Sequence, residues 1–139
     1  MARAANRAVL AMVVLVLAGC RSSDSPIFFS SPTPPYPDVP VPVTFELMST
    51  NSPNPGATVG ARYMEHVYQS KDALEPVAQY FRDQLPKNGW TLQGQTQGNG
   101  DSMMRFSKGG ELLEIQMWRG STIRTNTRLR ITGAAGMGK

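Results

Sequence analysis

The sequence holds very few of the residues that build disulfides and metal sites. Its 139 residues include one cysteine, Cys20, and one histidine, His66. A single cysteine excludes a disulfide within the chain, and a single histidine excludes any site that needs two imidazoles. Because a zinc site takes three or four nitrogen or sulfur ligands, we expect neither a metal nor another cofactor.

Long apolar runs and clustered acidic residues are also missing. No apolar run reaches the roughly 18 residues that a membrane-spanning helix requires. The acidic residues are spread singly along the chain, unlike those of a calcium loop or the paired carboxylates of a glycoside hydrolase. The glycines between Gly94 and Gly100 open no predicted helix, so they do not indicate a phosphate-binding loop.

The one histidine has no recognisable catalytic partner. Nucleophilic catalysis needs a base beside a nucleophile. His66 lies in a predicted strand in which Glu65 points to the opposite face, and the sequence places no serine or orienting carboxylate within its reach. We interpret His66 as structural and expect that the protein is not an enzyme.

The first 19 residues have the pattern of an export signal. Arg3 and Arg7 form a positive head, and an apolar stretch of 11 residues follows from Ala8 to Ala18. That length suits a signal peptide and is too short to span a bilayer. The small residues before Cys20 would let an extended backbone enter a peptidase cleft, and a thiol is the best available nucleophile for alkylation.

The segment Leu17-Ala18-Gly19-Cys20 resembles the lipobox of bacterial lipoproteins. The resemblance implies cleavage of residues 1–19 as a signal peptide, a thioether-linked diacylglycerol on Cys20, and acylation of the new amino group by a fatty acid such as palmitate. Two or three chains, at about 0.8 kcal/mol per buried CH₂, anchor a protein stably in a membrane. We therefore expect a lipid-anchored protein on the periplasmic side of the cell envelope.

The residue after the cysteine bears on the choice of membrane. In well-studied enteric bacteria an acidic residue at this position favours retention in the inner membrane, whereas this chain has Arg21. By that analogy the outer membrane is favoured. Two of the 14 basic residues, Arg3 and Arg7, precede Cys20, which leaves 12 basic against 10 acidic residues after cleavage. This near balance gives no reason to expect nucleic acid as a partner.

A proline-rich segment follows the cysteine. Residues 21–42 hold seven of the 11 prolines, and the remainder is mostly Ser, Asp, Thr and Val, which cannot bury enough surface to fold. We expect residues 20–42 to form a lipidated cysteine and a tether, which as polyproline II at about 3.1 Å per residue would reach at most about 65–70 Å from the bilayer. A proline-rich ligand for a partner is the alternative, although Pro32-Thr33-Pro34-Pro35 is too generic to support it. The apolar triplet Ile27-Phe28-Phe29 either dips into the headgroups or is simply exposed.

A single domain is predicted over residues 43–132, followed by a flexible tail over 133–139. Two half-buried strands are expected at its start, because apolar and polar residues alternate there. In the second of these strands the pattern does not decide which side faces the core. The expected strands of the whole domain lie near 43–48, 61–69, 90–97, 102–108, 111–118 and 122–132.

One convincing helix is predicted over residues 72–85. Asp72 and Glu75 match a capping box at its start, and Pro86 cannot continue it. Asn88-Gly89 then supplies a turn with positive φ. The apolar side chains that share one stripe of this helix are Leu74, Val77, Ala78, Phe81 and Leu85. The expected fold class is α+β, an antiparallel sheet of about five to six strands with the helix packed on one face, in the order ββαββββ.

The loops predict how the last strands pair. A two-residue loop at Gly109-Gly110 joins the second and third of the last four strands, and a loop over residues 119–121 joins the third and fourth. Both loops turn Leu113, Ile115 and Met117 inward. The expected pairs are Phe106 with Leu113, Met104 with Ile115, Arg105 with Glu114, Met117 with Ile123, and Leu113 with Thr127.

The loop near Asn99 allows two registers. A two-residue loop at Asn99-Gly100 would place Phe106 opposite Gln93 and turn Leu92 to the wrong face. A three-residue loop over 98–100 places Phe106 opposite Leu92 instead. Since a slip of one residue inverts every side chain, we prefer the three-residue loop.

The order of elements resembles that of the small helix-on-sheet domains of many uncharacterised bacterial lipoproteins: the helix comes first, then Gly89-Trp90, then the hairpins. The likeness covers about ninety residues. It implies a fold, and no activity comes with it.

The strongest positive signal is a basic face of the sheet. Such a face binds an anionic polymer, lipid headgroups or an acidic partner, or else it is a solvated face on which Glu114 is ringed by Arg105, Arg124 and Arg128. Mixed aromatic, aliphatic and arginine surfaces are typical of protein interfaces. The candidate binding residues on this outward face are Arg105, Trp118, Arg124, Arg128 and Arg130, with Leu112 and Met103 beside them.

Three functions remain open. The favoured one is a membrane-anchored interaction or scaffold module that presents its outward sheet face to an envelope protein. The second is a binder of a small or polymeric envelope ligand, such as cell-wall glycan or lipid, and the least favoured is an enzyme. An exposed patch around Trp118 and Arg124 would favour the first. An apolar cleft between helix and sheet would favour the second, and a cleft holding His66 beside carboxylates the third.

Overall fold

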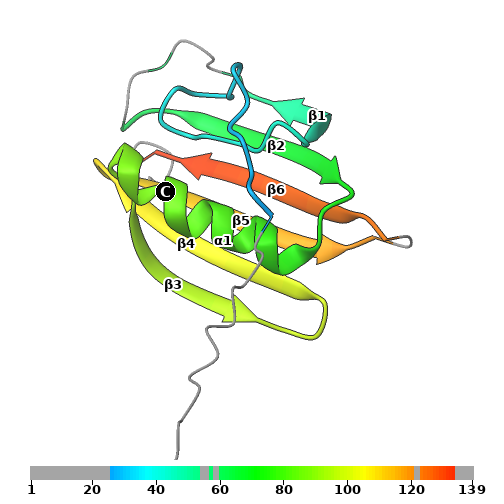
Figure 1. Cartoon of the computed structure of the whole chain (residues 1–139). Helices are drawn as coiled ribbons and strands as arrows, with labels where there is room; N and C mark the ends of the chain where they lie inside the picture. The colour runs from blue at the N-terminus through cyan, green and yellow to red at the C-terminus, as the bar shows by residue number, and fades with distance from the viewer. Residues whose placement is uncertain (1–25, 54–56, 58–59, 121–122, 134–139) are drawn as a thin grey trace, which may run out of the picture.

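The computed structural model describes residues 26–53, 57, 60–120 and 123–133. These residues form one six-stranded antiparallel sheet, in the strand order β1-β2-β6-β5-β4-β3, with one α-helix across one face (Figure 1). The predicted α+β class and the order ββαββββ are confirmed. The elements are β1 Glu46–Asn51, β2 Tyr63–Ser70, α1 Leu74–Gln84, the 3₁₀ helix η1 Pro86–Asn88, β3 Thr91–Gln97, β4 Asp101–Lys108, β5 Glu111–Arg119 and β6 Thr125–Thr132.

Alternation along the central strands separates a buried face from a half-exposed face. In β5 and β6 every second residue is buried, and the residues between them are mostly half-buried. Leu113, Ile115 and Met117 have no exposed surface, so their predicted inward orientation is confirmed. The helix packs its own buried stripe against this face, where Phe81 and Leu85 are fully covered. In β2 the same face carries Met64 and Tyr68, which answers the question that the pattern left open.

The β4–β5 hairpin has the predicted register. Phe106 pairs with Leu113 and Arg105 with Glu114. The loop residues Gly109 and Gly110 have φ values of +55° and +80°. Both angles lie in the left-handed region that a tight two-residue turn needs and that glycine adopts without strain.

The β5–β6 register differs from the prediction. Met117 pairs with Thr127 rather than with Ile123, and Leu113 pairs with Ile131 rather than with Thr127. The connection is longer than expected, because the amide of Gly120 donates to the carbonyl of Arg124 at 2.9 Å. The pairing therefore shifts by four residues. An even shift leaves each side chain on its predicted face.

A β-bulge reconciles the two registers considered for β3 and β4. The amide of Gly98 donates to the carbonyl of Asp101 at 3.0 Å, which leaves the two-residue loop Asn99-Gly100. The predicted three-residue loop is therefore wrong. Leu92 nevertheless pairs with Phe106 as predicted, because the register shifts between Leu92 and Gly94. One extra residue on the bulged strand restores the facing of the side chains.

The helix begins later than predicted and has no capping box. Its N-cap is Ala73, which makes no side-chain cap bond, and the Asp72 carboxylate instead accepts a hydrogen bond of 2.6 Å from Thr44 Oγ1. With this start, Pro76 falls in the first turn, where a backbone amide has no partner within the helix, so the proline removes no helical hydrogen bond. Gly89 has φ +87°, as predicted.

The proline-rich segment is part of the domain from Pro26 onward, which corrects the prediction of a tether through Pro42 and of a domain beginning at residue 43. Val39 and Val41 belong to the buried core. The amide of Ser31 donates to the carbonyl of Val41 at 2.7 Å, so the segment folds back on itself. Figure 1 shows this segment beside α1, over the part of the sheet formed by β1 and β2. Prolines allow this packing because the segment is held by side chains and a few hydrogen bonds, not by a full strand ladder.

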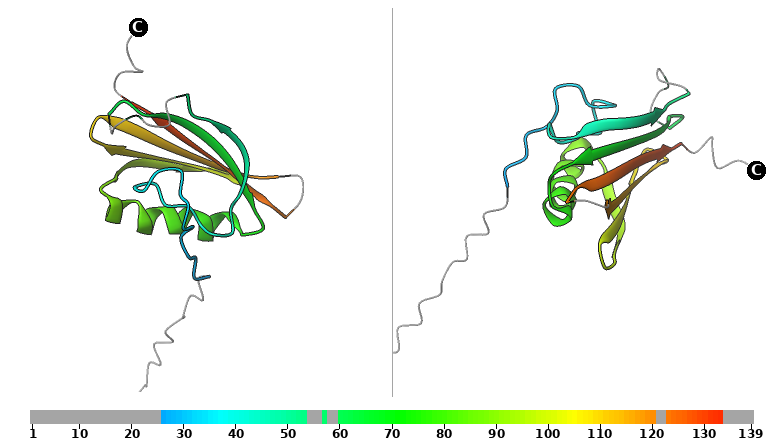
Figure 2. Two further views of the ribbon diagram at one scale, coloured as in Figure 1. Left: turned by 90° about the horizontal axis from the view of Figure 1, so that it is seen from above. Right: turned by 90° about the vertical axis from the view of Figure 1, so that its right-hand side faces the viewer.

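The helix and residues 26–42 lie on the same side of the sheet. Figure 2 shows both on one side, while the other sheet face is left uncovered by described elements. No helix among the residues described is long and apolar enough to cross a membrane. Residues 20–25 and 134–139, to which part of the tether and most of the tail were assigned, lie outside the described residues.

Candidate functional site

The uncovered face of the sheet, here termed the outward face, is built by every second residue of β2, β4, β5 and β6. The residues of β5 and β6 that alternate with the buried ones point to it, and they are mostly half-buried. Trp118 on β5 and Arg128 and Arg130 on β6 lie on this face, and Arg105 on β4 joins them. The structure thus brings together four of the five candidate binding residues.

The fifth residue, Arg124, lies at the end of the sheet. It precedes β6, and its guanidinium donates to Gln69 Oε1 at 2.8 Å and lies 3.8 Å from the Glu46 carboxylate. A hollow of about 550 Å³ lies beside it. The other residues lining this hollow are Lys71, Asp72, Ala73, Arg119, Ile123 and Thr125.

Acidic and basic side chains alternate across the middle of the outward face. Glu65 on β2, Arg130 on β6, Glu114 on β5 and Arg105 on β4 lie in successive paired positions. Arg130 contacts Glu65 at 3.0 Å, and Arg105 contacts Glu114 at 3.1 Å. The expected ring of Arg105, Arg124 and Arg128 around Glu114 is therefore wrong, because the longer β5–β6 connection sets Arg130 opposite Glu114. Both pairs remain open to solvent on one side, so each contributes less than about 1 kcal/mol.

Arg128 differs from its neighbours because it stacks on an aromatic ring. Its guanidinium carbon lies 5.6 Å from the centroid of the Trp118 ring, within the range of a cation–π contact. Its Nε is buried and has no hydrogen-bond partner among the described residues. Across the strand pair it faces Gln116, not a carboxylate.

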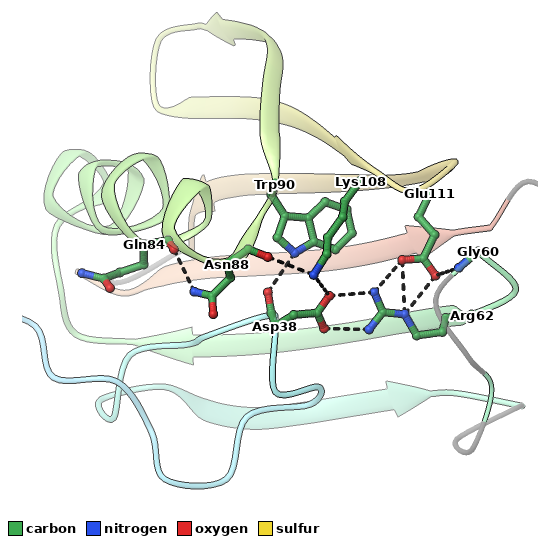
Figure 3. Close-up of polar contacts among 8 residues, drawn as sticks. All are labelled: Asp38, Gly60, Arg62, Gln84, Asn88, Trp90, Lys108 and Glu111. Carbon is green, nitrogen blue, oxygen red and sulfur yellow. Dashed lines mark hydrogen bonds and ion pairs between the residues drawn. The ribbon is translucent and has the colours of Figure 1, made fainter.

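A second charged cluster, here termed the clasp, lies on the other side of the sheet at the start of β5 (Figure 3). The Arg62 guanidinium donates from Nε to Glu111 Oε1 at 2.9 Å and from Nη1 to Asp38 Oδ1 at 2.7 Å. Lys108 Nζ contacts the other oxygen of Asp38 at 2.8 Å. The side chains of Arg62 and Glu111 are 4% and 0% exposed, so this is a buried network.

The clasp is closed by bonds to the backbone. The indole of Trp90 donates to the carbonyl of Asp38 at 2.8 Å, and the amide of Gly60 donates to Glu111 Oε1 at 2.8 Å. Lys108 also donates to the carbonyl of Asn88 at 2.9 Å. Figure 3 shows Asp38, from the proline-rich segment, between Arg62 and Lys108. The clasp therefore ties that segment to the sheet.

The charges of the clasp stabilise one another. Burial raises the pKa of Asp38, but hydrogen bonds and charges from Arg62 and Lys108 outweigh it and lower that pKa to about 2. Burial acts in the same direction on Glu111, and the hydrogen bonds from Arg62 and from the Gly60 amide again prevail, so its pKa is lowered. Hydrogen bonds to Glu111 and Asp38 raise the pKa of Arg62. All of these groups are therefore charged and paired at neutral pH, which indicates a structural role.

The clasp is hard to predict from the sequence. Its charged residues come from three separate segments, Asp38, Arg62 and the β4–β5 hairpin with Lys108 and Glu111, and each resembles an ordinary surface charge. One signal was available: Asp38 stands beside Val39 and Val41, which are apolar residues in a segment assigned to solvent.

His66 has hydroxyl neighbours that the sequence did not reveal. Its Nε2 lies 2.7 Å from Thr50 Oγ1 and 3.1 Å from Ser52 Oγ, and its Nδ1 lies 3.0 Å from the Tyr68 hydroxyl. Burial lowers the pKa of His66 and raises that of Tyr68 to about 12. A serine thus does lie within reach of His66, contrary to expectation. The hydrogen bonds found for the imidazole go to hydroxyls, none to a carboxylate among the described residues.

The other sites considered from the sequence find no support in geometry. Among the described residues, no group of three or more His, Cys, Asp or Glu side chains is placed to hold a metal ion. The interface between α1 and the sheet is filled, since Val77, Phe81, Phe106, Ile115 and Leu129 have no exposed surface. The outward face thus remains the candidate functional site.

Comparison with known proteins gives one match. A family model described as START domain-like matches residues 47–122, which is more than half of the chain. The match begins at the second residue of β1, runs through β5 and ends before β6, so Arg128 and Arg130 lie outside it. No curated protein and no solved structure matches the chain.

Proposed function

The chain belongs to the START domain-like family, and we propose that its domain serves as an interaction module of the bacterial envelope, anchored through lipid on Cys20, with the outward face binding a protein. The proposal places the protein on the periplasmic side of a membrane, with the outer membrane favoured by Arg21. The anchor is supported by the lipobox pattern, and the binding surface by the contacts of Arg128.

The observation that carries the binding surface is the stack of Arg128 on Trp118. Tryptophan and arginine are the residues most enriched at energetically important positions of protein interfaces. Arg128 has no carboxylate within ion-pair distance among the described residues, while Arg105 and Arg130 each have one. A partner that supplies a carboxylate or carbonyl to Arg128, and an apolar group to Trp118, would complete contacts that this chain leaves open.

The surroundings of the stack fit an interface with a polar rim. The ion pairs Arg105–Glu114 and Arg130–Glu65 lie next to it on the same face, and apolar Val67 pairs directly with Arg128 across β2 and β6. Interfaces typically surround a few strong contacts with weaker polar ones that exclude water. This arrangement favours a protein partner over a small ligand, which would need a concave pocket.

The experiment is photo-crosslinking in intact cells with the full, anchored protein. A photoreactive residue replaces Gln116, which faces Arg128 across β5 and β6, and a tag after Lys139 allows capture. We expect a discrete protein adduct that is lost in Arg128→Gln. A photoreactive residue at Gln79, exposed on α1, should give no such adduct.

A matched substitution separates the role of Arg128 from a general effect of charge. Arg105→Gln makes the same change on the same face, but Arg105 already has a partner in Glu114, so the adduct should persist. An adduct that survives Arg128→Gln, or none at Gln116, would overturn the proposal. A glycan or lipid adduct instead would indicate an envelope-ligand binder.

The anchor is tested separately by fatty-acid labelling. Cells fed a clickable palmitate analogue should label the wild-type protein, and Cys20→Ala should abolish the label. Because Cys20 is the one cysteine of the chain, the fatty acid cannot be attached through the sulfur of another cysteine. A labelled Cys20→Ala variant would contradict the anchor.

A further inference from the structure

Three exposed apolar side chains gather where the described chain begins. Ile27 is 83% exposed, Phe29 is 71% exposed and Val43 is 55% exposed. The amide of Val43 donates to the carbonyl of Phe29 at 2.8 Å, which places these two residues side by side. Exposed apolar groups that are contiguous mark a surface for a partner or a membrane. We refer to Ile27, Phe29 and Val43 as the apolar tip.

The apolar tip is held on the domain by its neighbours in the sequence. Phe28 makes an edge contact with Tyr80 of α1, with ring centroids 5.9 Å apart, and Ser30 Oγ lies 2.7 Å from the Tyr80 hydroxyl. Phe28 and Ser30 therefore face the helix, and the residues that alternate with them, Ile27 and Phe29, face solvent. Further along, Asp38 fastens the same segment through the clasp. The tip is thus a fixed part of the fold.

The distance from the lipid-bearing cysteine to the tip is short. With residues 26–42 folded onto the domain, only the five residues 21–25 separate Cys20 from Pro26, so the two are six residue steps apart. Six residue steps span at most about 20 Å when fully extended, far less than the reach expected of a 22-residue tether. A linker this short keeps the tip at a local concentration of the order of millimolar at the bilayer, so even weak insertion would be populated.

The tip has the chemistry of a bilayer contact rather than of an acidic or anionic partner. The residues of α1 next to Ile27 and Phe28 include no lysine or arginine; they are Pro76, Gln79, Tyr80, Asp83 and Gln84. Aromatic and aliphatic side chains insert at the boundary of headgroups and acyl chains through their apolar area. Because the α1 residues beside Ile27 and Phe28 carry no positive charge, the contact made by this part of the tip should depend little on salt.

We propose that Ile27, Phe29 and Val43 insert into the bilayer surface and dock the domain on the membrane that holds Cys20. The inference rests on the proposed lipid anchor. It also fixes an orientation: residues 26–42 lie on the helix side of the sheet, and the outward face lies on the opposite side (Figure 2). Docking through the tip therefore turns Trp118 and Arg128 away from the membrane, toward a periplasmic partner.

The experiment measures membrane depth with a spin label on the lipidated protein in vesicles of phosphatidylethanolamine and phosphatidylglycerol. Acylation of Cys20 leaves any introduced cysteine as the one free thiol. One variant is Ile27→Cys, and its matched control is Ile123→Cys, because Ile123 is an isoleucine of similar exposure, 93%, that lies outside the tip, at the β5–β6 connection. We expect the label at position 27 to be several-fold less accessible to a water-soluble nickel chelate than the label at 123. Equal accessibility would overturn the docking.

A second variant tests the side chains that do the inserting. A label at Val43→Cys should lie in the bilayer, and the double change Ile27→Ser with Phe29→Ser should return it to water. Circular dichroism checks that the variant is folded. If the label at position 43 stays inaccessible to the nickel chelate in this variant, another surface docks on the membrane, which contradicts the proposal.

The outcomes separate docking from anchoring. If Cys20 carries no lipid, the protein does not float with the vesicles, and the proposed anchor fails before depth is measured. If the protein floats but the label at position 27 is as accessible to the nickel chelate as the label at position 123, the lipid anchor is supported and the proposed docking is wrong. Repeating the measurement at high salt should leave the depth unchanged, whereas release by salt would indicate an electrostatic contact instead.

Discussion

At the scale of single residues, the chain has two kinds of ion pair with different physical roles. The pairs on the outward face, such as Arg105–Glu114, are exposed enough that water competes with them. In the clasp, Glu111 is 0% exposed, and its carboxylate receives hydrogen bonds from Arg62 and from the Gly60 amide. Losing one partner there leaves a buried charge without compensation, which costs far more than the pair itself contributes.

We therefore expect unequal effects from the same substitution at two glutamates. Glu111→Leu should lower the free energy of unfolding by about 3–5 kcal/mol, because Arg62 stays buried and loses half of its partners. Glu114→Leu should change it by less than about 1 kcal/mol, because its partner Arg105 is exposed. Urea denaturation of the two variants measures the difference. Similar losses in both would mean that the clasp is no more than a surface pair.

Residue-scale features were the hardest to predict from the sequence. Strand alternation alone predicts that Arg105, Trp118, Arg128 and Arg130 share one face, and the structure confirms it. Arg124, predicted on the same face, instead precedes β6. Their partners depend on register: Glu114 was expected beside Arg128 and lies beside Arg130. The clasp depends on contacts between distant segments, for which the local pattern carries no information.

At the scale of elements, prediction succeeded where local chemistry decides and failed where tertiary contacts decide. The glycines at 109 and 110 fix their hairpin because the turn needs positive φ at both positions. The bulge near Gln93 is not predicted by either loop length alone. The two-residue loop would turn Leu92 away from the core, and the bulge restores its orientation. The helix start was misplaced because Asp72 bonds to Thr44 instead of capping.

The uncapped helix start makes a further prediction. Ala73 has the extended backbone of an N-cap, with φ −69° and ψ 153°, and makes no side-chain cap bond. Because Pro76 has no amide at the third helical position, only the Glu75 amide is left for a new cap. Ala73→Asp should therefore raise the free energy of unfolding by about 0.5–1 kcal/mol, through this bond and the helix dipole.

Asp72→Ala serves as the comparison for that variant. A capping box at Asp72 would make this change cost about 1 kcal/mol, whereas the structure leaves only its exposed hydrogen bond to Thr44 to be lost. The urea midpoint should therefore rise for Ala73→Asp and change little for Asp72→Ala. The reverse order would place the helix start at Asp72 after all.

At the scale of the whole molecule, the core is shared by three parts of the chain: the sheet, α1 and the proline-rich segment. Phe45 contacts all three: its ring lies 5.4 Å from that of Tyr68 on β2 and 6.1 Å from that of Phe81 on α1, and its amide donates to the carbonyl of Pro42 at 3.1 Å. The composition of residues 21–42 suggested a spacer because proline content is averaged over the segment. The few apolar residues within it, which do the packing, were outweighed in that average. Sequence alone therefore placed the domain boundary too late.

The shared core predicts that a domain cut at the boundary suggested by the sequence is damaged. A protein beginning at Val43 loses Val39 and Val41, each worth about 1.5–3 kcal/mol of burial, and leaves Arg62 and Lys108 without Asp38. Since domains are stable by only about 5–15 kcal/mol in all, we expect it to be largely unfolded or to bind a dye for exposed apolar surface. A protein beginning at Pro26 should unfold cooperatively in urea. Adding residues 26–42 as a separate peptide should restore part of the lost stability, because the contacts are made by that segment and not by the chain connection. If the proteins that begin at Pro26 and at Val43 had equal urea midpoints, residues 26–42 would be a spacer after all.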